Sequence, residues 1–336
     1  MIIGSFVLFI IAYTKIGGAE NILNVVPSGH WNLFRPADDA SLPWHAIILG
    51  YPILGIWFWC TDQTIVQRVL GARDIKQGQY GTIFMGFLKI VSALIFFLPG
   101  IIAVGLFPNI QNPDTVYMTM VTNLLPTGMI GLIIAILLAA LVSTVDGALN
   151  SFSTVFTFDV YKAFFNPNVD EKKLRFYGQL FTMLAGITGI LIAMFMSSLG
   201  KDMFNLLQGI IAFFAPPMSS VFLIGVLWRR ATSKAAFFTL VFGSILSLSV
   251  GYCQISNFPN ADFWPHYMLL SFYLFVFLSI IMIIVSLFTK DTVSTEPLPT
   301  LKETYKTGNS YKAVWILWAV LAVIMVALYI IFNVVL

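Results

Sequence analysis

Hydroxyl side chains crowd one apolar segment of the sequence, LLAALVSTVDGALNSFSTVFTFDVYK, at residues 137–162. Ala140, Ser143 and Thr144 follow the i, i+3, i+4 spacing, so on a helix they share one face. Two hydroxyls and a backbone carbonyl on that face supply the oxygen ligands that a hard cation such as Na⁺ prefers. The alternative is close helix packing by small residues, with each hydroxyl bonded to its own helix. The spacing alone leaves both interpretations open.

Three ionisable residues lie within apolar segments or at their ends: Asp62, Lys89 and Asp146. Charged groups at membrane depth are costly and commonly face a cavity or a partner, so each is a candidate functional residue. Each also has a structural explanation. Lys89 can extend its ammonium group to the membrane surface. Asp62 can pair with Arg68, and the carboxylate of Asp146 can be satisfied by N–H or hydroxyl groups near the membrane surface.

Residues 204–230, FNLLQGIIAFFAPPMSSVFLIGVLWRR, combine a glutamine with a proline pair. Pro216 and Pro217 remove two backbone donors and are predicted to break the helix in mid-span. Broken helices at membrane depth commonly line a solute path. Gln208 can face such a path, or it can form a hydrogen bond between two helices.

The elements that position these residues are predicted to be membrane-spanning helices. The chain is 59% hydrophobic and only 10% charged, with a mean hydropathy of +0.90, whereas a soluble domain carries about 25% charged residues. A span needs about 20 apolar residues. The candidate spans, nine in all, lie roughly at 2–16, 45–64, 81–107, 128–149, 176–198, 204–228, 235–254, 267–288 and 313–335. The sequence therefore predicts an all-α integral membrane protein whose partner is a lipid bilayer.

Lys and Arg are unevenly distributed around these predicted spans. Fourteen follow the even-numbered spans, three lie on the opposite side (Lys15, Arg35 and Lys201), and Lys89 lies deep within a span. Cytoplasmic loops are enriched in Lys and Arg. The larger loops predicted to be cytoplasmic are 162–175, 229–234 and 289–312. The loops predicted to be outside are 17–44, 108–127 and 255–266.

Other functional classes find no support in the sequence. The net charge of +3 is too small to indicate nucleic-acid binding. Cys60 and Cys253 lack metal-ligand spacing and are predicted to be buried structural thiols. No Ser-His-Asp set, HExxH, CxxC or P-loop motif occurs, so nothing in the sequence indicates an enzyme.

Three stretches resemble the sodium/glucose cotransporter branch of the sodium:solute symporter family. They are WFWCTDQTIVQRVLGARD at 57–74 followed by FLK at 87–89, ALVSTVDGALNSFSTVFTFDVYK at 140–162, and the 204–230 segment quoted above. The resemblance covers essentially the whole chain. It implies part of a leucine-transporter-like fold of two inverted five-helix repeats, with the first span as the fifth core helix and the last three spans outside the core.

The resemblance also implies a sodium site and the residues around it. Na⁺ would be the coupling ion, bound by the carbonyl of Ala140 and the hydroxyls of Ser143 and Thr144. Thr144 stands where many members of the family have Ser, and it keeps the hydroxyl. The residues that the resemblance implies as gate or supporting residues are Asp62, Arg68 and Asp146.

A sugar site is implied in the same way. Lys89 and Gln208 would bond sugar hydroxyls, with Trp59 and Phe58 beside the ring and Asn205 as a further polar neighbour. Phe58 stands where sugar transporters usually have a gating Tyr, so it can stack on a sugar but cannot donate a hydrogen bond. Another departure is Gly55, which stands where they usually have Asn or Thr. These departures leave the identity of the sugar open.

The implied function is sodium-coupled symport of a sugar such as glucose or galactose across the plasma membrane, or the inner membrane of a bacterium. The alternatives are symport of another solute (myo-inositol, sialic acid, proline or a carboxylate), a sensor that binds without transport, and a fragment without function. The family's first core helices would precede Met1, so the chain is expected to be truncated at its N-terminus. Residues 1–336 are predicted to form a single transmembrane transport domain of undetermined oligomeric state.

Overall fold

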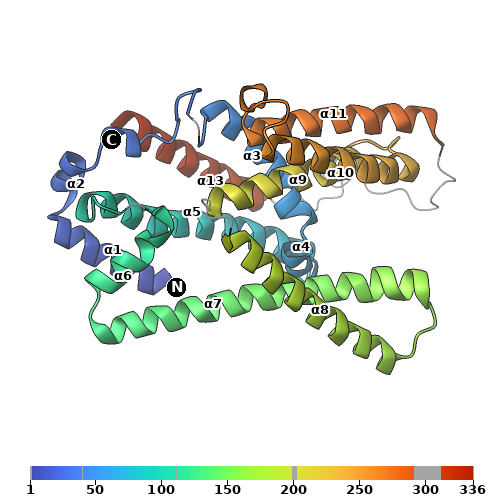
Figure 1. The fold of residues 1–336 in the computed structure, drawn as a ribbon, viewed down its shortest axis with the longest axis horizontal. Helices are drawn as coiled ribbons and strands as arrows, with labels where there is room; N and C mark the ends of the chain where they lie inside the picture. Colours follow the sequence, from blue (N-terminus) through green and yellow to red (C-terminus); the bar gives the residue numbers. More distant parts are fainter. Residues whose placement is uncertain (1, 40, 111, 199–202, 291–311, 336) are drawn as a thin grey trace. The chain divides into compact units, whose positions relative to one another are not determined.

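The chain folds into helices throughout the part that the structure describes (Figure 1). The structure is a computed structural model that describes residues 2–335 except 40, 111, 199–202 and 291–311. Within those residues no β-strand forms, and eight helices are long and apolar enough to cross a membrane. Counting the pair α1 and α2, bent by 76°, as one span gives nine. The predicted all-α membrane fold is confirmed, although most of the predicted loop at 289–312 lies outside the described residues.

Contacts within the chain divide it into two compact units. Unit 1 comprises residues 1–27 and 91–202, and unit 2 comprises residues 28–90 and 203–336. Helix α5 (Ile75–Leu106) contributes to both. The other helices of unit 1 are α1 (Ile2–Ile16), α2 (Ala19–Val25), η3 (Pro113–Thr115), α6 (Val116–Leu124), α7 (Thr127–Thr154), η4 (Val155–Phe165) and α8 (Glu171–Ser198). Those of unit 2 are η1 (Ser28–His30), α3 (Trp44–Ile56), η2 (Trp57–Thr61), α4 (Gln63–Leu70), α9 (Met203–Leu227), α10 (Ser233–Ile255), η5 (Ala261–Phe263), α11 (Tyr267–Phe288), α13 (Lys312–Ile330) and η6 (Ile331–Val335).

Unit 1 is built around the long helix α7 and its neighbour α8. Helix α7 continues without a break as the π-helix η4. The Ser153 hydroxyl donates to the Gly178 carbonyl at 2.7 Å, and the rings of Tyr161 and Tyr177 lie 4.0 Å apart. A hydrogen bond and an aromatic contact therefore join α7 and η4 to α8.

The core of unit 2 lies where α3, α9 and α11 meet. Ile53 and Leu54 of α3 pack against Ala212 and Ala215 of α9, and aromatic rings of α11 cover this cluster. The Ser219 hydroxyl on α9 donates to the Ile53 carbonyl on α3 at 2.8 Å. Apolar packing and this buried hydrogen bond hold α9 on α3.

Small residues let the helices of unit 2 approach closely. A Cβ added at Gly50 of α3 would overlap the Met268 carbonyl oxygen and lie 2.8 Å from the Met268 Cβ on α11. Small interfacial residues of this kind are typical of packing between membrane helices. Helix α10 presents a buried row four residues apart, which consists of Thr239, Gly243, Ser247 and Gly251.

The prediction that Pro216 and Pro217 break the helix is wrong, because α9 is continuous across both. The two prolines leave the carbonyls of Ala212 and Phe213 without their usual backbone donors. Both proline side chains are completely buried, and α9 packs against α3, α10 and α11. Packing by three neighbours compensates for the lost hydrogen bonds and keeps the helix unbroken.

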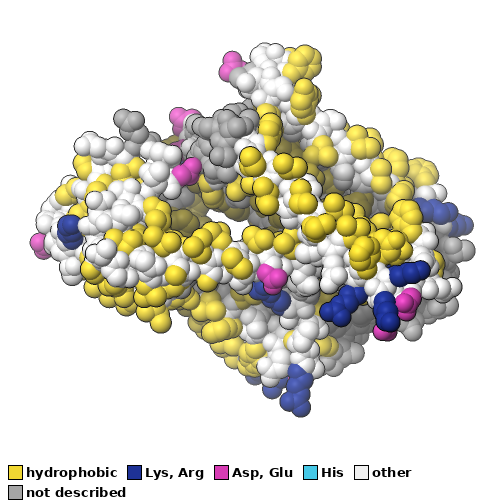
Figure 2. All heavy atoms as spheres, turned by 60° about the horizontal axis from the view of Figure 1, so that its bottom comes forward, with side chains coloured by type: hydrophobic (Ala, Val, Ile, Leu, Met, Phe, Trp, Pro, Cys, Tyr) yellow, Lys and Arg dark blue, Asp and Glu magenta, His cyan; other side chains and the backbone are white. Residues whose placement is uncertain are grey.

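The surface is as apolar as the composition requires. Figure 2 shows hydrophobic side chains over much of the visible face, interrupted by few charged ones. Cys60 belongs to the exposed surface and Cys253 is only partly buried, so the prediction that both are buried thiols is wrong. Because lipid replaces water around such a surface, a thiol can lie outside the protein core without contacting water.

Polar and aromatic contacts join neighbouring helix ends in unit 2. The Thr232 and Thr289 hydroxyls lie 2.6 Å apart and join the start of α10 to the end of α11. At the opposite end of α11, His266 contacts the Ser41 carbonyl just before α3. Phe34 lies on Tyr329, so the end of α13 meets the loop that is predicted to be outside.

Candidate functional site

The aromatic candidates lie on a widened turn at the end of α3. Residues 57–61 form the π-helix η2, which ends with the Asp62 N–H donating to the Trp57 carbonyl at 3.1 Å. Single π-turns occur frequently at functional sites. Within this turn the Phe58 and Trp59 rings pack edge to face with centroids 5.1 Å apart, and Trp59 is exposed. The turn therefore presents an aromatic face on which a sugar ring can stack.

Lys89, on the part of α5 that belongs to unit 2, is close to this aromatic face. Its Nζ lies 6.0 Å from the centroid of the Trp59 ring. That separation is at the limit of a cation–π contact. The structure thus brings together two residues that are 30 positions apart in the sequence, as a shared site requires.

Asn205 and Gln208 are the polar candidates on α9. They lie three residues apart and therefore on one face of the helix. The Gln208 amide nitrogen donates to the Tyr51 hydroxyl on α3 at 2.9 Å. The Tyr267 hydroxyl at the start of α11 donates to the Asn205 amide oxygen at 3.2 Å. Both amides are thus engaged by tyrosines of neighbouring helices, which also matches the interhelical hydrogen bond considered for Gln208.

The sodium candidates lie together on α7, in unit 1. The Thr144 hydroxyl donates to the Ala140 carbonyl at 2.9 Å, so two of the three predicted ligand atoms are neighbours. This is the hydrogen bond of a hydroxyl to its own helix, yet both oxygens keep lone pairs with which to bind a cation. Ser143, Thr144 and Asp146 are exposed. Three oxygens fit part of a shell of about six, so other groups must complete the site.

The predicted gate residues Asp62 and Arg68 do not pair in the structure. Asp62 is the N-cap of α4, where its carboxylate accepts the Thr64 N–H at 2.8 Å. Among the described residues the ion pair found is Arg35 with Asp39, at 3.5 Å. Capping explains why an acidic residue ends this span, because an Asp oxygen satisfies a backbone donor that the helix leaves free.

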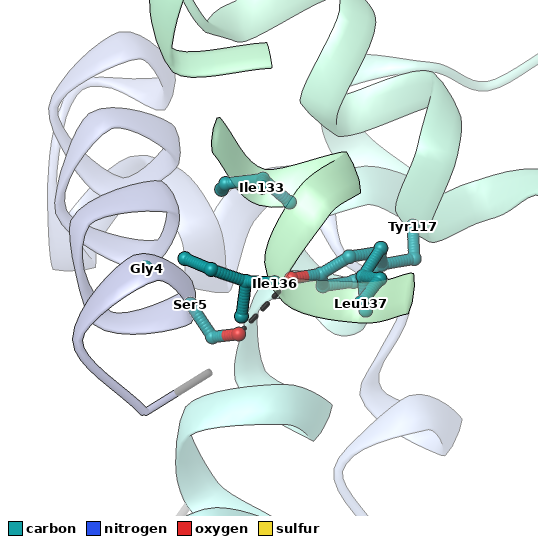
Figure 3. A pocket seen from close by; sticks show the side chains of 6 residues that line it. All are labelled: Gly4, Ser5, Tyr117, Ile133, Ile136 and Leu137. Carbon is teal, nitrogen blue, oxygen red and sulfur yellow. Dashed lines mark hydrogen bonds between the residues drawn. The ribbon is translucent and has the colours of Figure 1, made fainter. Parts of the chain in front are cut away.

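Unit 1 also contains a small pocket between α1, α6 and α7, shown in Figure 3. It is lined by Gly4, Ser5, Tyr117, Ile133, Ile136 and Leu137. The Ser5 and Tyr117 hydroxyls lie 3.0 Å apart, so they satisfy each other. The lining is otherwise apolar, and it includes none of the predicted site residues.

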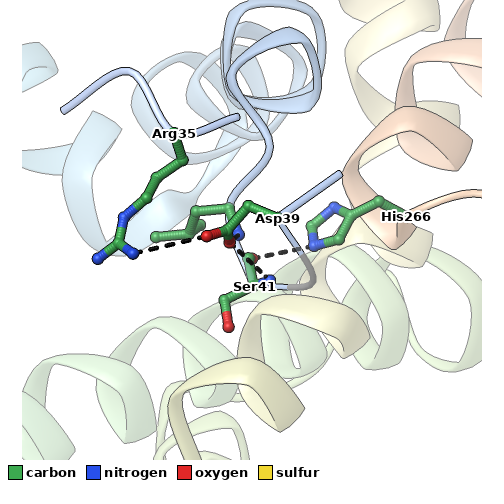
Figure 4. Close-up of polar contacts among 5 residues, drawn as sticks. Arg35, Asp39, Ser41 and His266 are labelled. Carbon is green, nitrogen blue, oxygen red and sulfur yellow. Dashed lines mark hydrogen bonds and ion pairs between the residues drawn. The ribbon is translucent and has the colours of Figure 1, made fainter. Parts of the chain in front are cut away.

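The loop that precedes α3 is tied to α11 by a short series of polar contacts (Figure 4). Asp39 accepts the backbone N–H groups of Leu42 and Ser41 at 2.8 and 2.9 Å and pairs with Arg35. These N–H groups, with a smaller contribution from Arg35, lower the pKa of Asp39. The Ser41 carbonyl in turn lies 3.0 Å from His266 Nε2, so the loop reaches the first turn of α11.

His266 holds this contact in its neutral form. Its Nδ1 accepts the Met268 N–H at 3.3 Å and caps α11, so the hydrogen must be on Nε2, which donates to Ser41. Burial lowers the pKa of His266, and nearby His45 acts in the same direction. The Ser41 carbonyl and Asp39 oppose the shift but do not reverse it.

We expect acidification to weaken this contact between the loop and α11. Because the pKa of His266 is lower in the folded protein than its unfolded value of about 6.5, its contribution to stability is complete above that pH and is lost as pH falls through the folded pKa. The melting temperature should fall on acidification, and less so in His266→Asn, because Asn caps a helix without titrating. An equal pH dependence in both proteins would contradict the role of His266, since Asp39, His45 and Arg35 are unchanged.

Tyr51 and Tyr267 are the residues of this region that the sequence did not indicate. Their partners are 157 and 62 positions away, so no local spacing marks them. A weak signal was available, because a hydroxyl-bearing ring near the end of an apolar span usually has a polar partner.

Comparison with known proteins gives a consistent result. The sequence model of the Sodium:solute symporter family matches residues 1–243. Sodium/glucose cotransporter 1 of Sus scrofa is 30% identical over 340 residues, which cover 86% of this chain and 51% of that protein. Sodium/myo-inositol cotransporter 2 of Bos taurus is 34% identical over 74% of this chain and 42% of its own length. Sodium/mannose cotransporter SLC5A10 of Bos taurus is 33% identical over 72% of this chain and 46% of its own length. The chain therefore spans about half the length of the curated relatives that it matches.

Proposed function

The chain belongs to the sodium:solute symporter family, and we propose that it forms part of a transporter that moves a polyhydroxylated solute, such as glucose or galactose, together with Na⁺ across the plasma membrane. Members of this family are membrane transporters and not enzymes. The eight long apolar helices agree with a multi-pass membrane protein.

The proposal rests on two groups of side chains in unit 2 that can bind a sugar. Lys89 lies over Trp59, and the amides of Asn205 and Gln208 share one face of α9. An exposed aromatic ring offers a surface for the apolar face of a sugar. Amide and ammonium groups offer hydrogen bonds to its hydroxyls. The sodium candidates Ala140, Ser143 and Thr144 occupy α7 in unit 1, so solute and ion would be bound by different parts of the chain.

The energy for uphill transport would come from Na⁺ entry. A membrane potential supplies about 2.3 kcal/mol per charge per 100 mV, and a tenfold sodium gradient adds about 1.4 kcal/mol. One Na⁺ per solute therefore supports a solute gradient of several hundredfold, on the basis that 1.4 kcal/mol is tenfold.

The names of the relatives suggest glucose, myo-inositol and mannose as candidate solutes. The sodium/glucose relative covers more of the chain, and the sodium/myo-inositol relative is more identical where it matches. Both solutes are rings of neighbouring hydroxyl groups, which suit the same amides. Gly55 offers no polar side-chain group and therefore favours neither glucose nor myo-inositol.

Uptake by the full-length natural protein tests this function. We expect labelled glucose or myo-inositol to accumulate in sodium medium, and replacement of Na⁺ by choline to abolish the accumulation. Gln208→Ala should raise the half-saturating solute concentration about tenfold, because one hydrogen bond to the solute is lost. Cross-competition by the unlabelled solutes identifies the preferred one. Equal uptake in choline and sodium would contradict the proposal.

A further inference from the structure

Three membrane-length helices of unit 2 end beside one another. Helix α9 ends at Leu227, α10 begins at Ser233, and α11 ends at Phe288. The buried N–H of Thr232, in the turn between α9 and α10, donates to the Ser286 hydroxyl of α11 at 3.3 Å. Because all three helices are long and apolar enough to cross a membrane, the place where they end together is expected among the lipid headgroups.

This turn concentrates positive charge at one end of the three helices. Residues 228–235 read WRRATSKA, and the basic ones are Arg229, Arg230 and Lys234. In residues 203–290 of the sequence the single acidic residue is Asp262, in the loop that joins the opposite ends of α10 and α11. The N-terminal end of α10 adds a partial positive charge of its own. An anion is therefore attracted more strongly to the turn between α9 and α10 than to the other end of these helices.

Arg230 is oriented by a contact with α11. Its Nη2 donates to the Leu287 carbonyl at 3.4 Å, in the last turn of that helix. A guanidinium group carries five N–H donors in a planar fork that matches phosphate oxygens, so one contact with a carbonyl leaves other donors for a phosphate. The side chains of Arg230 and Lys234 are both exposed. Both can therefore reach a phosphate group outside the protein.

Exposed apolar side chains surround this basic turn. Phe237 follows Lys234 by three residues, so the two share a face of α10, and the ring of Phe237 is 71% exposed. Phe288, at the end of α11, is 87% exposed. Surface of this kind on a membrane-spanning helix contacts acyl chains and not water. A phospholipid supplies both a phosphate for the cations and hydrocarbon for the rings, whereas a free phosphate ion supplies only the first.

We propose that the turn between α9 and α10 binds the headgroup of an anionic phospholipid, with Arg230 and Lys234 contacting its phosphate and Arg229 adding charge. The acyl chains lie along the exposed apolar surface of α10 and the end of α11. The distribution of Lys and Arg predicts that this turn faces the cytoplasm, where the membrane leaflet carries anionic lipids. Lys290 is left out of the site because Asp291 directly follows it in the sequence. The solute candidates are near the opposite end of α9, so the lipid site does not depend on the proposed function.

Binding of phosphatidylglycerol to the full-length natural protein tests this inference. Native mass spectrometry during titration with the lipid gives the affinity, and melting in phosphatidylcholine nanodiscs with and without phosphatidylglycerol gives the stabilisation. We expect phosphatidylglycerol to raise the melting temperature, because a ligand that binds the folded state stabilises it. The double variant Arg230→Gln with Lys234→Gln should bind the lipid about 30-fold more weakly, since each basic residue near an anionic surface contributes about 1 kcal/mol.

A matched variant removes the same charge elsewhere. Lys172 and Lys173 are exposed in the first turn of α8, in unit 1, and Asp170 and Glu171 precede them. Lys172→Gln with Lys173→Gln should leave the affinity for phosphatidylglycerol nearly unchanged. Arg230→Lys keeps the charge and should bind the lipid more tightly than Arg230→Gln. This second comparison separates loss of charge from loss of folding, even where the double variant is less stable.

Three results would overturn the inference. If the double variant at the turn binds phosphatidylglycerol as tightly as the unaltered protein, the turn is not the site. If the α8 variant loses as much affinity, the attraction is a diffuse effect of net charge. Inorganic phosphate should leave the melting temperature in phosphatidylcholine nanodiscs unchanged, and a rise equal to that produced by phosphatidylglycerol would show that the turn binds a free anion and not a lipid.

Discussion

Replacing Ser143 with Ala in the full-length natural protein is expected to raise the sodium concentration for half-maximal uptake about tenfold or more. Ser143 lies one helical turn from Ala140 and beside Thr144, whose hydroxyl is 2.9 Å from the Ala140 carbonyl. A bond between a neutral oxygen and a charged partner contributes about 1.5–3 kcal/mol, and every 1.4 kcal/mol is tenfold. The measurement is solute uptake as a function of sodium concentration at saturating solute.

Changes at Thr144 provide the control for this prediction. Thr144→Val removes the hydroxyl at almost constant volume and should also raise the sodium requirement, whereas Thr144→Ser should leave it nearly unchanged. Thr154 is a matched residue on α7, because its hydroxyl donates in the same way to the Asn150 carbonyl, at 2.7 Å. Thr154→Val should therefore not alter sodium dependence. If Ser143→Ala leaves the sodium requirement as it is, the assignment of this helix face to Na⁺ is wrong.

Gly50→Val is expected to prevent normal folding of unit 2. A side chain at this position would overlap the Met268 carbonyl on α11, and a backbone atom cannot move aside by a change of rotamer. Overpacking of a buried interface typically costs about 1–3 kcal/mol and sometimes more, and the added methyl groups of Val place this change at the upper end. The yield of monodisperse protein in detergent and its melting temperature measure the effect.

The same helix offers a contrasting glycine. A Cβ at Gly55 meets no atom within 4 Å, so Gly55→Ala should leave the melting temperature unchanged or raise it, because Ala favours the helix over Gly. Gly50→Ala should be intermediate between the unaltered protein and Gly50→Val. Equal melting temperatures for Gly50→Val and the unaltered protein would show that α3 and α11 do not approach as closely as described.

Features that depend on local apolar length were predictable from the sequence. The spans at 2–16, 204–228 and 267–288 correspond closely to α1, α9 and α11, because an uninterrupted apolar run has no stable alternative to a helix in lipid. The spacing on α7 likewise placed Ala140 and Thr144 side by side, because helix geometry alone determines that contact.

Features that depend on distant partners were not predictable. The proline pair was expected to break α9, but the packing of three other helices outweighs the local loss of hydrogen bonds. Asp62 was considered as a partner of Arg68, yet its carboxylate accepts a backbone N–H group at the start of α4. No local sequence pattern indicated Tyr51 or Tyr267. For the prolines and the tyrosines the result depends on which residue another part of the chain brings within reach, whereas the Asp62 cap is a contact with the next two residues.

The proline pair in the middle of α9 has a mechanical consequence. A helix that lacks two successive backbone hydrogen bonds is less stiff at that point, so α9 bends there more easily than elsewhere along its length. Ser219, just beyond the prolines, donates a hydrogen bond to the Ile53 carbonyl and so holds the C-terminal half of α9 on α3. Asn205 and Gln208 are on the other half, where hydrogen bonds with Tyr267 and Tyr51 join α9 to α11 and α3. We therefore expect any bending of α9 to occur at the prolines, so that the half carrying Asn205 and Gln208 moves relative to the half that Ser219 holds.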